Sequence, residues 1–163
     1  MNKIEILPKA AVFCLKLKTG ETLFSEVIND PNFIRDDILV LKEPFSISYI
    51  RDENKEIMTG TPWCPFANNA LVPILLNMTF YIDRLNPKFL RFYGSILMQN
   101  KISEIKNEVY ENMQDKNDYY MMMEGIERIK AVSTEISEKF GLPNEIDTKD
   151  FEERAEKFKP AFH

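Results

Sequence analysis

Residues 11–28, with the sequence AVFCLKLKTGETLFSEVI, decide the fold of the first half of the chain. Apolar and polar side chains alternate toward the end of residues 11–18 and again over residues 22–28, and a period of two is typical of a β-strand with one buried face. Residues 18–21 supply a turn between the two runs, in which Gly20 can take a positive φ. The sequence therefore predicts a β-hairpin.

Further strand signals follow before residue 86. A short apolar run at residues 38–41 stops at Glu43-Pro44, and residues 45–50 alternate apolar with small polar side chains. Residues 52–55 read as a polar turn, and residues 71–82 are the remaining strand material. Short strands with close turns predict a small antiparallel barrel, which removes exposed sheet edges by closing on itself.

The apolar period lengthens to about 3.6 residues after Asn86, and this period predicts helices. Asn86 suits an N-cap and Pro87 suits the first helical turn. A second helix is expected over residues 119–140, ending at Gly141. The first helix has an apolar stripe of Phe89, Tyr93, Ile96, Leu97, Ile105, Val109 and Met113, and the second has a seam of Met122, Ile126, Ile129, Ser133, Ile136 and Phe140.

A third, short helix is expected from Asp147 to about Phe158, because acidic residues in its first turn favour the positive end of a helix. The sequence as a whole predicts an α+β fold in two parts. Residues 1–85 form the β-barrel, and residues 86–163 form a C-terminal helical region.

Residues 17–27 resemble the first signature of Sm and Sm-like (LSm) proteins. Leu17, Gly20, Leu23 and Val27 match its apolar and glycine positions, and Ser25 stands where the family usually has a second glycine. The resemblance covers roughly residues 10–85 and is closest in appearance to phage-type Sm-like proteins from marine sequence collections, whose Pro-Trp-Pro-like loop is similar to residues 62–65. It implies a bent five-stranded barrel that assembles into a homo-oligomeric ring and binds single-stranded RNA.

In RNA-binding members of that family, an Asp and an Asn after the first signature and an Arg-Gly or Lys-His element in the second build the nucleotide pocket. Asp30 and Asn32 lie in the corresponding region, whereas residues 68–82 contain no Arg-Gly or Lys-His pair. We therefore assign no nucleic-acid-binding residues from the sequence. Trp63 and Phe66 are aromatic side chains that either stack nucleobases or plug one end of the barrel.

No constellation of residues for catalysis or metal binding stands out. His163 is the only histidine and ends the given sequence, where it has no fixed neighbours that would make it a general base. Cys14 and Cys64 lie far apart without a neighbouring Cys or His, which does not fit a zinc site or a CxxC motif. We expect a protein that is not an enzyme and that has no cofactor and no bound metal.

Two pairs of adjacent carboxylates are the other polar candidates. Asp36 and Asp37 form one pair, and Glu152 and Glu153 form the other. Adjacent side chains point in different directions, and neither pair has a third ligand nearby in the sequence. We interpret both pairs as solvated surface.

The function expected from these observations is a ring of identical subunits with single-stranded RNA as a partner. The alternative is a structural or adaptor protein that binds protein partners through its C-terminal helices, and residues 119–123 (YYMMM) are either such a docking surface or self-packing at a helix start. The net charge of −5 weakens any proposal of strong non-specific nucleic-acid binding. No signal or membrane-spanning segment is evident, so we expect a soluble protein in the cytoplasm, or in the host cytoplasm if its source is viral.

Overall fold

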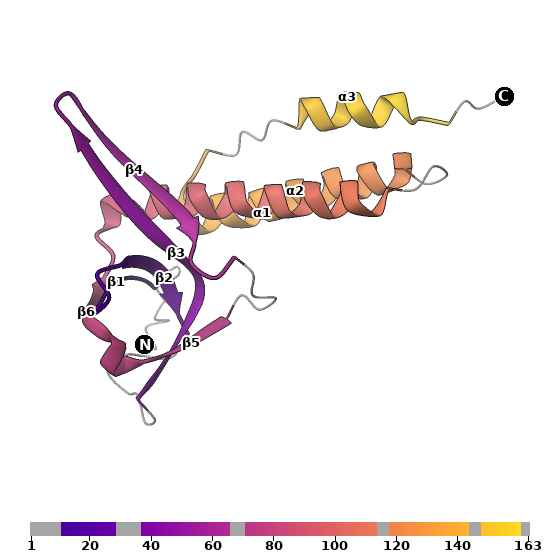
Figure 1. Cartoon of the computed structure of the whole chain (residues 1–163). Coiled ribbons are helices and arrows are strands. Elements are labelled where there is room, and N and C mark those ends of the chain that lie inside the picture. The colour runs from indigo at the N-terminus through magenta and orange to yellow at the C-terminus, as the bar shows by residue number, and fades with distance from the viewer. Residues whose placement is uncertain (1–10, 29–36, 66–70, 114–117, 144–147, 161–163) are drawn as a thin grey trace, which may run out of the picture. The chain divides into compact units, whose positions relative to one another are not determined.

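The structure is a computed structural model that describes residues 11–28, 37–65, 71–113, 118–143 and 148–160 (Figure 1). The predicted α+β class is confirmed, because an antiparallel sheet is followed by helices. The chain divides into two compact units, Met1–Tyr93 and Gly94–His163. This division lies beyond the predicted boundary after residue 85 and inside the first long helix.

Among the described residues of the first unit, six strands form the sheet, in the order β4-β3-β2-β1-β6, with β5 paired to β3 outside this path. They are β1 (Val12–Leu17), β2 (Thr22–Val27), β3 (Ile38–Asp52), β4 (Lys55–Pro62), β5 (Leu71–Leu75) and β6 (Thr79–Arg84). The predicted hairpin is confirmed as β1 and β2, which pair antiparallel around Gly20 with its φ of 100°.

The sheet differs from the closed, five-stranded barrel expected from the sequence. It has six strands, and β4 and β6 at the two ends of the order are each paired with a single neighbour among the described residues. The runs at residues 38–41 and 45–50 were predicted as two strands but are one strand, β3. Residues 71–82 divide into β5 and β6 around a 3-10 turn, η2 (Leu76–Met78).

Both faces of the sheet bury apolar side chains. One face holds a core of Leu15, Leu17, Leu23, Leu39, Leu41 and Ile74. On the other face, Phe24 and Phe45 lie opposite each other in the register of β2 and β3. Phe89 of η3 (Pro87–Phe89) and Phe92 and Tyr93 of α1 (Leu90–Asn112) pack on these two rings, at centroid distances of 6.0 to 6.4 Å. The first turn of α1 therefore belongs to the sheet unit.

The second unit contains the remainder of α1, α2 (Asp118–Phe140) and α3 (Lys149–Lys157). The predicted seam of α2 is confirmed, because all six of its residues are buried. A Cβ on Gly94 would lie 2.6 Å from Cβ of Phe140, so a glycine is needed where α1 and α2 approach each other. Phe151 and Ala155 bury α3 in the same core as Ile126.

The ends of the helices follow the sequence signals closely. Asn86 accepts a hydrogen bond from the backbone N–H of Lys88 at 3.2 Å and Pro87 begins the first turn, as predicted, although that turn is 3-10. Gly141 ends α2 with a φ of 67°. The proposed cap of α3, Asp147, lies outside the described residues. In the part of the chain that the structure describes, no helix is long and apolar enough to cross a membrane.

Candidate functional site

A bulge in β3 bends the sheet and positions its outer strands. The register between β2 and β3 shifts between Phe24 and Glu26, so that β3 holds one extra residue there, and Glu43 has a φ of 52°. Before the bulge, Ile38 to Lys42 pair with β5; after it, Phe45 to Asp52 pair with β4. The bulge thus separates the partners of β3 into two groups.

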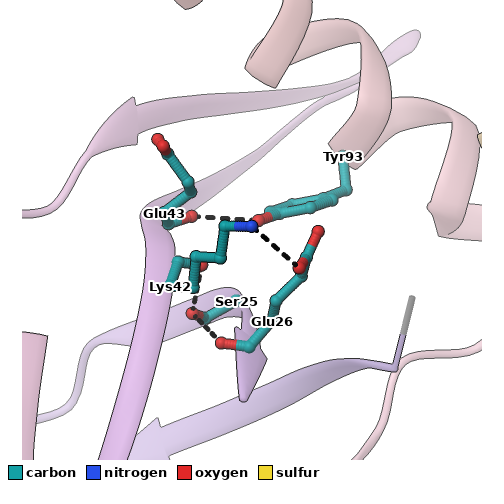
Figure 2. Close-up of polar contacts among 5 residues, drawn as sticks. All are labelled: Ser25, Glu26, Lys42, Glu43 and Tyr93. Atoms are coloured by element: carbon teal, nitrogen blue, oxygen red, sulfur yellow. Dashed lines mark hydrogen bonds and ion pairs between the residues drawn. The ribbon is translucent and has the colours of Figure 1, made fainter. Parts of the chain in front are cut away.

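Part-buried hydrogen bonds link the residues around the bulge, as Figure 2 shows. The Tyr93 hydroxyl donates to the backbone carbonyl of Glu43 at 3.0 Å. The Ser25 hydroxyl lies 2.8 Å from the carbonyl oxygen of Glu26 and 3.0 Å from that of Lys42. Lys42 Nζ is 4.0 Å from the Glu26 carboxylate. Ser25 stands where the similar family usually has a glycine. Its hydroxyl has hydrogen-bond acceptors here, because two backbone carbonyls lie within reach.

Tyr93 and Ser25 act in this cluster as hydrogen-bond donors to the backbone. Burial raises the pKa of Tyr93 far above its usual range, and the nearby Glu26 carboxylate raises it further. Tyr93 is therefore a neutral hydrogen-bond donor. Ser25 is fully buried and donates to main-chain carbonyls, so it is not placed as a nucleophile.

The distal half of the hairpin formed by β3 and β4 leaves the rest of the sheet. We call residues 48–52 and 55–59 the β3–β4 arm. All five residues of its β3 strand are exposed, as are four of the five in its β4 strand. Figure 1 shows the arm running out beyond the other strands. Ile50 and Ile57 lie directly opposite each other on it and are 57% and 46% exposed.

The sheet offers three outer edges, and they are not equivalent. An outer strand presents unpaired N–H and C=O groups that can pair with another strand. Within β5, Pro73 has no N–H to donate, which protects that edge. In β4, proline occurs only at the last residue, Pro62, and β6 contains none. Edges β4 and β6 are therefore the ones open to pairing.

Edge strand β6 carries the most exposed large apolar side chain in the described part of the chain. The register between β1 and β6 shifts so that Phe80 is an extra residue, and its side chain is 78% exposed. The backbone N–H of Lys18 donates to the carbonyl of Met78 at 2.9 Å, which places the β1–β2 turn beside this bulge. An aromatic ring and a lysine backbone thus lie close together at the edge.

A groove of about 710 Å³ lies on the face of the sheet covered by the start of α1. Val12, Phe24 and Leu90 are among the apolar residues that line it, and Asp83 and Arg84 of β6 are charged lining residues. Other lining residues are Ala11, Cys14, Tyr81, Leu85, Asn86, Pro87 and Phe89. The groove is therefore an apolar recess that contains the carboxylate of Asp83, which lies opposite Cys14 in the register.

Cys14 in this groove is not an activated thiol. Burial raises its pKa, and the carboxylate of Asp83, which lies opposite it in the register, raises it further. A thiolate is the reactive form of cysteine, so these two effects oppose nucleophilic chemistry at neutral pH. Asp83 accepts a hydrogen bond from the Tyr81 hydroxyl at 2.9 Å.

Trp63 is half-buried on the face of the sheet that carries the Leu15 core. It packs against the core that contains Leu15 and donates its indole N–H to Glu21 at 3.3 Å. Its backbone N–H donates to the carbonyl of Pro44 at 2.9 Å. These contacts make Trp63 a packing residue of the sheet, whereas Phe66 lies outside the described residues.

The other residues singled out in the sequence do not converge. Asp30, Asn32, Asp36 and His163 lie outside the described residues. Cys64 is half-buried with a free thiol. Asp37, Glu152 and Glu153 are exposed, and Glu152 lies 3.9 Å from Lys130 and accepts a hydrogen bond from Thr148. The described residues contain no group of three or more His, Cys, Asp or Glu that could hold a metal ion.

Residues 119–123 are divided between the core and the surface. Met122 is fully buried, whereas Tyr120 and Met123 are exposed. The self-packing interpretation is therefore confirmed for Met122 only, and the docking interpretation stays a prediction. Self-packing accounts for Met122, and a surface on α2 remains at Tyr120 and Met123.

Comparison with known proteins does not assign the chain to a family: no family model matches it, and no curated protein matches it. The features with functional potential are thus the two open edges, the β3–β4 arm and the groove. Sequence patterns did not single out the arm or Phe80. Exposed isoleucines and aromatics follow the same alternation as buried ones, and only the pairing of the strands distinguishes them.

Proposed function

We propose that the protein is a non-enzymatic Sm-like protein that assembles through open sheet edges into a homo-oligomeric ring. The observation that carries this proposal is the presence of two different open edges, β4 and β6, at opposite ends of one strand order. When an edge of one copy pairs with a different edge of the next, the contact repeats head to tail, and the assembly closes if the rotation permits.

Two features support the Sm-like part of the proposal. Signature residues Leu17 and Leu23 are buried in the core of the β1–β2 hairpin, and Gly20 takes the positive φ of its turn. The bulge at Glu43 bends a long central strand, as a small, strongly curved sheet requires. Fold resemblance carries no activity by itself, so assembly needs its own test.

The assembly is tested by sedimentation equilibrium of the full chain, whose mass is 19.1 kDa. We expect a single species of several subunits at micromolar concentration. Phe80→Lys should lower the mass, because lysine on an edge strand discourages pairing. Tyr120→Lys is the matched control, since it also replaces an exposed aromatic but lies on α2. A wild-type mass of one subunit would exclude the ring.

Single-stranded RNA is the ligand that we propose for this ring. Phe80 offers an exposed ring for base stacking, and Lys18 is an exposed cation in the adjoining turn. Stacking on aromatic rings together with backbone charge contacts is the usual basis of single-strand binding without sequence preference. The acidic net charge of −5 means that any such contact is local.

Binding is tested with uridine-rich and adenine-rich single strands across a salt series. We expect affinity to fall as salt rises, and Phe80→Ala to lose about 1–3 kcal/mol of binding free energy, the usual contribution of one base stacked on an aromatic ring. Trp63→Phe serves as the control, because that half-buried side chain packs against the core. No binding at low salt would contradict RNA as the ligand.

The second candidate function is an adaptor that binds a protein through its helices. It is favoured by exposed Tyr120 and Met123 on α2 and by a recess of about 400 Å³ that Met123 and Ile126 line together with charged residues of α3. Methionine is common at adaptable docking surfaces. The absence of RNA binding, with the ring intact, would favour this function.

A further inference from the structure

The β3–β4 arm lacks the support that a two-stranded ribbon needs. An isolated pair of strands is marginally stable in water, and a third strand or a packed face is normally required. Both strands of the arm are exposed over residues 48–52 and over most of residues 55–59. The arm therefore has apolar side chains available for a contact outside the described fold of one chain.

One face of the arm combines an apolar pair with a charged pair. Ile50 lies opposite Ile57, and Asp52 lies opposite Lys55. Because alternate residues of a strand point to the same side, these four side chains share a face, which we call the isoleucine face. Met58 lies on the opposite face of the arm.

The groove beside β6 has the complementary chemistry. Its apolar lining, which includes Val12 and Phe24, suits the two isoleucines. Its carboxylate, Asp83, can pair with Lys55. The isoleucines are exposed in the chain that also carries the groove, so one copy does not fill its own groove.

We propose that the isoleucine face of the β3–β4 arm of one copy lies against the β6 groove of the next copy. This inference rests on the proposed assembly through β4 and β6. It adds a side-chain contact, between the arm and the groove, to the pairing of the two edges. A neighbour's β4 beside β6 extends the sheet, turns Ile50 and Ile57 toward the groove and brings Lys55 near Asp83. The second copy is the occupant because it supplies both the apolar pair and a lysine for Asp83.

Chemical crosslinking tests this arrangement with the native thiol of the groove, Cys14. The full chain carries Cys64→Ser throughout, and a cysteine is placed on the arm as Ile57→Cys. A short bismaleimide is used instead of direct oxidation, because β6 separates Cys14 from the sheet edge. The matched control is Met58→Cys, the next residue of the same strand on the opposite face. A mildly alkaline buffer offsets the raised pKa of Cys14.

We expect Ile57→Cys to give crosslinked dimers and higher species at a yield at least several-fold above that of Met58→Cys. Adding Cys14→Ser should abolish them. Equal yields from the two positions, or no crosslink in a preparation whose mass is multimeric, would overturn the arm contact and leave the ring intact. A monomeric mass for the parent Cys64→Ser chain would remove both proposals, so the two failures are distinguishable.

Discussion

Glu43 shows how single residues stabilise the bent sheet. Its φ of 52° lies in the left-handed region, which costs a residue with a Cβ about 1–2 kcal/mol. The Tyr93 hydroxyl satisfies its carbonyl at 3.0 Å, and Trp63 donates to the carbonyl of the next residue, Pro44, at 2.9 Å. Contacts from distant parts of the chain therefore hold the strained position.

Tyr93→Phe should destabilise the sheet unit. The substitution keeps the ring that packs on Phe45 but removes the hydrogen bond to the Glu43 carbonyl, and the net contribution of one such bond is about 0.5–1.5 kcal/mol. Urea unfolding followed by far-ultraviolet circular dichroism measures the change. Tyr120→Phe is the control at an exposed tyrosine and should stay within about 0.5 kcal/mol of wild type. An unchanged midpoint for Tyr93→Phe would show that the hydrogen bond does not support the bulge.

At the scale of elements, the helices were more predictable than the sheet. The α2 seam could be recognised because helical burial repeats locally, every three or four residues, and Gly141 marks its end. Strand β3 was read as two strands because Glu43-Pro44 looks like a turn, and only pairing with β2 makes it a bulge. Strand β4 was missed because Gly60 and Pro62 are poor strand formers. Non-local pairing decided all of these points.

Charges placed in the α2 seam should unfold the helical unit. Ile129 and Ile136 are buried, and replacing both by Asp puts two carboxylates into an apolar core, at a cost of several kcal/mol each unless they are protonated or reach water. Thermal melting and sedimentation of the double variant should report loss of helix or aggregation. Ala131→Asp, on the exposed side of α2, should melt like wild type. A wild-type melt and mass for the double variant would refute the packing role of the seam.

At the scale of the whole molecule, the two units offer different means of association. The sheet unit has two open edges, which offer main-chain groups for pairing. It also has an arm and a groove, which offer apolar side chains. The helical unit closes its own core through α3 and leaves Tyr120 and Met123 exposed. We accordingly propose that self-assembly uses the sheet unit. The residues that would contact a ligand were not predictable from the sequence, because base stacking and partner docking use the same exposed aromatic residues.

Hydrogen exchange of the backbone amides in β4 and β6 is the most direct measurement of self-assembly through these edges. Edge pairing protects amides that exchange rapidly in a single chain, whereas the proline-containing edge of β5 gains no partner. We predict that β4 and β6 become protected as protein concentration rises and lose protection on dilution, while β5 does not change. Exchange in β4 and β6 that is independent of concentration, in a sample shown to be multimeric, would contradict assembly through these edges.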